Sequence, residues 1–141
     1  MRGHTLVELT FVLLLVGVAV SSVAPMARKA RDRTAVVAAR EMLVGLVTQA
    51  RQAAIETGAA GVRIVQDGGV AEVVTAGGVL RRVALTSELG VTLELGGGRS
   101  EVELRYDALG LGRMASQTVV IRRAEAVAEL VVSSYGRVRR G

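Results

Sequence analysis

The sequence predicts an α+β protein in which one long N-terminal helix, transmembrane in its first half, packs on a small all-β domain of two short antiparallel sheets. Three observations predict this fold class. Residues 9–27 form a charge-free apolar run, and apolar residues then recur at helical spacing as far as Thr57. From Gly61 onward the apolar period changes to two, and seventeen glycines against one proline favour many turns between short strands.

Length and composition limit the possible classes of protein. A chain of 141 residues holds one domain, or a short segment and a small domain. With no cysteine it has no disulfide framework and no thiolate metal site. A net charge of +5 and a pI near 10.9 are compatible with nucleic acid or anionic lipid as a partner, but they demonstrate neither.

The apolar N-terminal run has two general interpretations. As a secretory signal peptide it has the basic Arg2 and a small-x-small site at residues 22–24, but Glu8 interrupts its apolar core and Pro25 follows the cleaved bond. As a plain membrane anchor, its charge-free residues span about 28 Å at 1.5 Å per residue, close to the hydrocarbon thickness. Neither interpretation explains Glu8, because a carboxylate at the edge of such a segment is costly to keep in hydrocarbon.

A third interpretation accounts for Glu8. The stretch Gly3-His4-Thr5-Leu6-Val7-Glu8-Leu9 resembles the class III signal of type IV prepilins and pseudopilins, in which a short basic leader ends in glycine. Counted from His4 as the first residue, Glu8 is fifth, Gly17 is fourteenth and Pro25 is twenty-second, and all three match the family pattern. The resemblance implies that a prepilin peptidase removes residues 1–3 and that the new amino terminus, His4, is methylated.

Physical reasoning agrees with these assignments. Glycine, which has no side chain, fits easily into a tight protease subsite in an extended conformation, as Gly3 would have to do. A buried carboxylate such as Glu8 can pair with the N-terminal ammonium of its own or a neighbouring subunit, and such a pair specifies register more than it adds stability. Gly17 and Pro25 are weak points at which the helix could kink or locally unwind during assembly.

The distribution of charge around the span bears on its orientation. Four basic residues lie between positions 28 and 33, whereas only Arg2 and the amino terminus precede the span. A positive-inside count alone would place the following domain in the cytoplasm. The resemblance overrules this count, because the peptidase needs Gly3 on the cytoplasmic side. It implies a single-pass protein of the inner membrane with its globular domain in the periplasm, which later enters a periplasmic pseudopilus or pilus.

After Pro25 the helix is expected to continue to a C-cap at Gly58, and strands follow. The chain therefore divides into the leader (1–3), the transmembrane and filament-core helix (4–27), the amphipathic half of the same helix (28–58) and the β-rich domain (59–141). Seven strands are predicted, at residues 62–65, 70–75, 79–85, 91–95, 101–106, 118–123 and 127–139. The last two are expected to form a hairpin through residues 124–126.

No pattern in the chain predicts catalysis. The single histidine is His4, so the β-domain can contain neither a histidine triad nor a histidine metal site. The stretch Gly96–Arg99 lacks the ending of a phosphate-binding loop and favours a hairpin turn. Glu101 and Glu103 share one strand face and are expected to be a solvated pair. We therefore expect no enzyme activity, no metal and no cofactor.

Further residues indicate a particular group within this family. The helix from Ala35 to Gly58, the β-rich remainder and the closing stretch Ser134-Tyr135-Gly136-Arg137-Val138-Arg139 resemble the GspH/FimT group of minor pseudopilins and minor pilins. GspH-type members are minor subunits near the tip of the type II secretion pseudopilus, where other major and minor pseudopilins are their partners. FimT-type members belong to type IV pili, and some take part in DNA capture during natural transformation.

The C-terminal segment bears on the choice between these types. If it is one strand, alternation places Tyr135, Arg137 and Arg139 on one face, and Arg140 follows. Guanidinium groups beside an aromatic ring could hold phosphates and stack on a base, and Gly136–Arg139 matches a Gly-Arg-x-Arg pattern associated with DNA binding in FimT-type proteins. A solvated basic tail is the other interpretation. A structural role in secretion is favoured, with a DNA-binding minor pilin as the alternative.

Overall fold

The computed structural model describes residues 5–141, apart from the side chain of Ser22. Gly3 and His4, the predicted processing site, lie outside the described residues. The chain divides into two compact units, of which the first ends at Arg31 and the second runs from Asp32 to Gly141.

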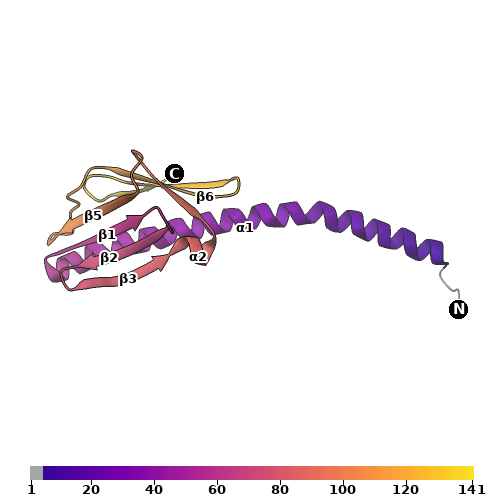
Figure 1. The fold of residues 1–141 in the computed structure, drawn as a ribbon, viewed down its shortest axis with the longest axis horizontal. Coiled ribbons are helices and arrows are strands. Elements are labelled where there is room, and N and C mark those ends of the chain that lie inside the picture. Colours follow the sequence, from indigo (N-terminus) through magenta and orange to yellow (C-terminus); the bar gives the residue numbers. More distant parts are fainter. Residues whose placement is uncertain (1–4) are drawn as a thin grey trace. The chain divides into compact units, whose positions relative to one another are not determined.

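Helix α1, Leu6–Thr57, contributes to both units (Figure 1). It ends where the sequence predicts, because Gly58 adopts a φ of 90° and its N–H donates to the Ala54 carbonyl at 2.8 Å. Glycine adopts this left-handed conformation without the penalty that a Cβ atom imposes. The expected helix as far as Thr57 is thus confirmed for the described residues.

The first sheet contains four antiparallel strands in the order β3-β2-β1-β5. Their bounds are β1 Ala59–Val65, β2 Val70–Thr75, β3 Gly78–Ala84 and β5 Glu101–Asp107. Buried and more exposed residues alternate along β2 and β5, as expected for strands with one face on a core. The sheet therefore covers one side of the second half of α1, as Figure 1 shows for β1 and β2.

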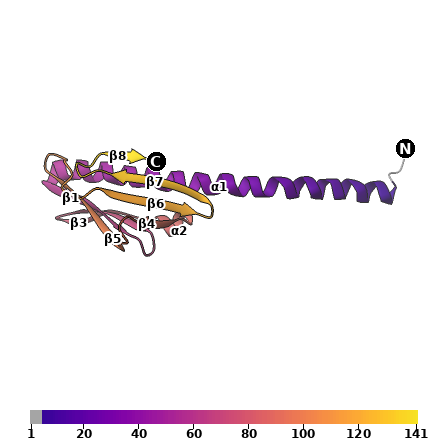
Figure 2. The ribbon, with the colours of Figure 1, turned by 90° about the horizontal axis from the view of Figure 1, so that it is seen from above.

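The second sheet is also antiparallel, in the order β4-β6-β7-β8. Its strands are β4 Thr92–Leu95, β6 Gln117–Arg123, β7 Ala126–Val132 and β8 Val138–Arg140. Strands β6 and β7 form the predicted hairpin, with Ala124 in its turn at a φ of 49°. Figure 2 shows β8 at the edge of this sheet, beside β7.

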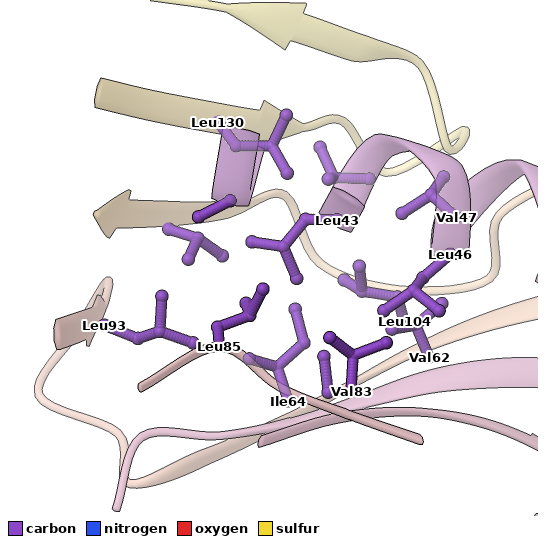
Figure 3. Packing of buried hydrophobic residues seen from close by; sticks show 14 of the residues in the cluster. Leu43, Leu46, Val47, Val62, Ile64, Val83, Leu85, Leu93, Leu104 and Leu130 are labelled. Carbon is purple, nitrogen blue, oxygen red and sulfur yellow. The ribbon is translucent and has the colours of Figure 1, made fainter. Parts of the chain in front are cut away.

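The core lies between α1 and the two sheets, entirely within the second unit. Figure 3 shows Leu43 of α1 between Leu130 of one sheet and Ile64 of the other. The buried face of α1 is rich in alanine, whose small side chain allows the sheets to approach the helix closely. The α1 residues of the core are Ala35, Val36, Ala39, Leu43, Leu46, Val47, Ala50, Ala53 and Ala54. Because the core needs no residue before Asp32, the second unit has the contacts of an independent domain.

The structure corrects three sequence-based expectations. The predicted strand 127–139 is two strands, β7 and β8, so the described chain has eight strands rather than seven. A short helix, α2 (Leu85–Leu89), follows β3 where strand was expected to reach Leu85, and Gly90 ends it at a φ of 65°. The glycine turn before Arg99 connects β4 of the second sheet to β5 of the first, so it does not join the strands of one hairpin.

Candidate functional site

The segment Leu6–Ala27 of the first unit presents a long apolar surface, with Glu8 as its single charged residue. Every described side chain from Leu6 to Ala27 is exposed, including Phe11 at 61 %. In the described chain α1 alone is long and apolar enough to cross a membrane, judged by length and composition. An apolar surface of this extent that the chain itself leaves uncovered is a candidate membrane anchor.

Glu8 lies in the first turn of α1, next to a cap that sequence reasoning missed. The backbone N–H of Glu8 donates to Thr5 Oγ1 at 3.3 Å. Thr-x-x-Glu is the pattern of a helix capping box, in which the first residue accepts from the backbone of the fourth. The signal was present in the sequence, because Thr5 stands three residues before Glu8. A local role in starting the helix therefore accompanies the predicted role of Glu8 in register.

Gly17 and Pro25 lie inside the continuous helix. A Cβ atom built on Gly17 would meet no atom within 4 Å, so the packing of the described chain does not require glycine there. Pro25 has no N–H with which to bond the Ser21 carbonyl, and Ser21 Oγ donates to the Gly17 carbonyl at 2.8 Å. Their role as weak points during assembly stays a prediction.

The C-terminal basic segment is built around a turn between β7 and β8. The Ser133 N–H donates to the Arg137 carbonyl at 2.9 Å, and the Gly136 N–H donates to the Ser133 carbonyl at 2.8 Å. Ser133 Oγ accepts from the Arg137 N–H at 3.0 Å. These bonds close a tight loop that presents Tyr135, 72 % exposed, at its tip.

Two glycines allow this turn to pack against the domain. Gly136 has a φ of 80°, and a Cβ atom there would lie 2.5 Å from the Tyr106 ring. A Cβ atom on Gly112 would lie 2.6 Å from the Gly136 nitrogen.

Burial raises the pKa of Tyr106 to about 12, against a smaller lowering by the charge of Arg51. The buried Tyr106 hydroxyl has no hydrogen-bond partner among the described residues.

The turn separates the residues predicted to share one strand face. Tyr135 and Arg137 belong to the turn, and Arg139 lies on β8 opposite Val131. Arg140, next along β8, points to the other face of the sheet, where its Nε and Nη2 each donate to Glu41 at 3.0 Å. The single strand on which this arrangement was expected is therefore wrong, because the turn at Gly136 interrupts it. Whether these residues bind DNA stays a prediction.

The Arg140 contact fixes the C-terminus to α1. The hydrogen bond from Arg140, with smaller help from Arg40, lowers the pKa of Glu41. Arg40 Nη1 also donates to the Gly141 carbonyl at 3.0 Å. By contrast, the guanidinium groups of Arg137 and Arg139 are exposed and form no ion pair with residues 5–141. These two are the cations of the segment that remain available to a partner.

The carboxylates Glu101 and Glu103 lie in surface ion pairs. Glu101 pairs with Arg63 at 3.2 Å and Glu103 with Arg105 at 2.9 Å, so each has a cation at the surface. Within residues 5–141, no three His, Cys, Asp or Glu side chains lie close enough to hold a metal ion.

A long helix with an exposed apolar first half, whose second half lies beneath two small antiparallel sheets, is the fold of pilin-like filament subunits. The type IV minor pilin FimU of Pseudomonas aeruginosa is similar in fold, with a TM-score of 0.56, 20 % identity, and coverage of 74 % of this chain and 90 % of that chain. The minor pseudopilin EpsH of the Vibrio cholerae type 2 secretion system is similar, with a TM-score of 0.54, 18 % identity and coverage of 74 % and 94 %. No protein-family model and no curated protein matches the chain.

These likenesses confirm the predicted fold class and the pilin-like fold expected from the resemblance to the GspH/FimT group. At such identities they concern the fold alone. One similar structure is a type IV minor pilin and the other a type 2 secretion pseudopilin, so the fold does not decide between the two types.

Proposed function

We propose that the chain is a minor pseudopilin, a structural subunit near the tip of a type II secretion pseudopilus, and not an enzyme. Prepilin peptidase cleaves it after Gly3, His4 becomes the methylated amino terminus, and Glu8 sets the register of the assembled helices. The protein is first held in the inner membrane with its β-domain in the periplasm, and it then joins other pseudopilins in the filament.

One observation carries this proposal. Apart from Glu8, the residues from Leu6 to Ala27 are uncharged and every described side chain among them is exposed, and they continue without a break into the helix that packs in the core of a pilin-like domain. Lipid and, after assembly, the helices of neighbouring subunits would cover such a surface. The motif from Gly3 to Glu8 supports the same conclusion.

The amino terminus of the mature protein tests the proposal directly. Intact-mass and N-terminal peptide analysis of the chain from its own membranes is expected to find His4 first, with an added methyl group. A start at Pro25 would indicate an ordinary secretory signal peptide, and a start at Met1 a plain anchor; either overturns the proposal. A Gly3→Leu variant is expected to keep residues 1–3, and Gly17→Leu, a matched change inside the helix, is expected to be processed normally.

The register role of Glu8 has a separate test. Glu8→Gln is expected to be processed and anchored but to lose incorporation into filaments, because the amide cannot pair as an anion with an N-terminal ammonium. The matched variant Glu56→Gln changes an exposed carboxylate of the same helix and is expected to assemble normally. Normal assembly of Glu8→Gln would refute the register role while leaving the processing result intact.

A second candidate function is that of a FimT-type minor type IV pilin that binds DNA. The observation in its favour is that Arg137 and Arg139 are exposed without an ion pair among residues 5–141, next to the exposed Tyr135. Arg140 contributes less than expected from sequence, because Glu41 holds its guanidinium group. Two or three cations would give weak binding that falls steeply with salt.

DNA titration of residues 28–141 distinguishes the two candidates. Micromolar binding that is lost in the Arg137→Ala, Arg139→Ala double variant would favour the DNA-binding pilin. The matched control is Arg81→Ala, Arg99→Ala, which removes two other exposed arginines that form no ion pair with the described residues. Absence of binding at physiological salt, or equal losses in both double variants, would favour the secretion pseudopilin.

A further inference from the structure

A group of exposed apolar side chains lies at the end of the domain where α1 ends. We call it the helix-end patch, and it consists of Ile55, Leu109, Leu111 and Tyr135. Their exposed fractions are 54 %, 77 %, 44 % and 72 %. Isolated exposed apolar residues are ordinary, but several that adjoin one another on a soluble domain indicate a contact surface.

Three segments that are distant in sequence meet at this patch. A Cβ atom on Gly110 would lie 3.2 Å from Ile55 Cδ1, so the 107–111 loop lies directly on the last turns of α1. Arg51 Nε donates to the Gly110 carbonyl at 3.1 Å, which fixes the loop to the helix. The Gly112 N–H donates to the Tyr135 carbonyl at 3.2 Å and brings the β7–β8 turn against the same loop.

The loop that carries the two leucines is held by Asp107. Its Oδ1 accepts from the N–H groups of Leu109 and Leu111, each at 3.0 Å, while its Oδ2 forms an ion pair with Arg113 at 2.9 Å. The Gly110 N–H also donates to the Asp107 carbonyl at 2.8 Å. The leucines are therefore exposed on a hydrogen-bonded loop, and a surface that is already ordered loses less entropy on binding than a mobile one.

The charges around the patch are mainly positive. Arg51 and Arg137 border it without an ion pair among residues 5–141, whereas Arg113 and Asp107 neutralise each other. Glu56, beside Ile55, accepts a hydrogen bond from Gln52 on α1. An apolar centre with a cationic rim fits a partner surface that has apolar residues at its centre and carboxylates around them.

We infer that the helix-end patch docks an acidic, apolar surface of a different filament subunit; this inference rests on the proposed function. A second copy of this chain is a poorer occupant, because an isologous contact through the patch would set its arginine rim against itself. DNA is also a poorer occupant. Ile55, Leu109 and Leu111 can neither pair with phosphate nor stack on a base, so three of the four patch residues would add nothing.

Site-specific photo-crosslinking in cells that produce the full chain tests this inference. Variants carry p-benzoylphenylalanine at Leu109 in the patch, at Val127 as an exposed apolar control on β7, or at Val12 in the apolar helix. The expected product at Leu109 is a protein adduct whose partner, identified by mass spectrometry, has its own apolar N-terminal helix and carboxylates at the crosslinked surface. Its yield should exceed that at Val127 about tenfold, the ratio for 1.4 kcal/mol of preference.

A charge reversal measures the contribution of the rim charges to docking separately from that of the apolar centre. Arg137→Glu is expected to lower the Leu109 adduct about fivefold, equivalent to about 1 kcal/mol for a rim charge, whereas Arg81→Glu on β3 should leave it unchanged. A Leu109 yield no higher than that at Val127, an adduct mainly with a second copy, a product that nuclease destroys, or no effect of Arg137→Glu would each overturn the inference.

The Val12 probe keeps the two proposals distinguishable. Adducts from Val12 to pilin-like subunits, without one from Leu109, would overturn the docking inference and leave the filament role standing. Absence of pilin-like adducts from both positions would overturn the filament role as well.

Discussion

Alanine in place of Gly136 should destabilise the domain far more than a surface substitution normally does. Gly136 has a φ of 80°, and a Cβ atom there would lie 2.5 Å from Cε1 of the buried Tyr106 ring. The ring is held by packing from all sides, so it cannot move away as an exposed side chain would. The variant therefore combines a backbone penalty with a steric one.

The two penalties can be estimated separately. A non-glycine residue in the left-handed region costs about 1–2 kcal/mol. Inserting a methyl group into a closely packed contact costs a further 1–3 kcal/mol or so. Gly98→Ala provides the matched control, because Gly98 has a φ of 66° and its Cβ atom would meet nothing within 4 Å. We therefore expect a loss of about 2–5 kcal/mol for Gly136→Ala and of about 1–2 kcal/mol for Gly98→Ala.

Urea unfolding of residues 32–141, followed by circular dichroism, measures both losses on the unit that holds the core. If the two variants lose equal free energy of unfolding, the contact between the turn and Tyr106 does not constrain the fold, and the geometry proposed for the C-terminal turn fails. Rescue offers a second check, since Tyr106→Leu shortens the side chain and should recover part of the loss in Gly136→Ala but not in Gly98→Ala.

Three further predictions concern the core and the pH dependence. Leu43→Ala should lower the free energy of unfolding by about 3–5 kcal/mol, because Leu43 is fully buried, and Met42→Ala on the exposed side should cost less than about 1 kcal/mol; urea unfolding compares them. Stability should fall as the pH rises from 10 to 12, because tyrosine ionises near 10 in the unfolded chain and the folded pKa of Tyr106 is about 12; Tyr106→Phe should remove this fall. The hydrogen bond from the Leu111 N–H, then that from Arg113, and then that from the Leu109 N–H lower the pKa of Asp107. Exchange protection of the Leu109 and Leu111 amides, followed by NMR, should therefore persist below pH 3.8 and be lost on further acidification.

The sequence predicted the parts of the fold that have a local cause. The change of apolar period located α1 and the strands, and Gly58 located the end of the helix, because only a residue that tolerates a positive φ ends it in this way. The period alone did not say which apolar side chains of α1 are buried: Val36 is 2 % exposed, whereas Met42 is 38 % exposed. Which of these apolar side chains is buried depends on how the sheets lie over the helix.

The features that the sequence did not predict depend on distant contacts. Helix α2 has five residues, too few for a period to be visible, and it forms where the Leu85 N–H donates to the Gly69 carbonyl at 2.9 Å. The break between β7 and β8 carries no proline and has Gly136 as its single turn signal. The pairing of Arg140 with Glu41 joins residues 99 positions apart, which no local pattern reveals.

Packing within the domain explains the residues in the second half of α1 but not those in the first half. From Ala35 to Ala54, the small and branched residues match the sheets that cover them, so the domain itself accounts for their order. Between Leu6 and Ala27 the side chains have no cover from the described chain, and Gly17 has open space around its Cβ position. Apart from the cap that Thr5 gives to the Glu8 backbone, nothing in the packing of the domain accounts for this segment, and the roles proposed for Glu8, Gly17 and Pro25 lie in processing and assembly. Substitutions there should change processing, membrane retention or assembly while the unfolding of residues 32–141 stays unaltered. A filament role for the first half of the helix predicts this difference, because its contacts would then be made with lipid and other subunits.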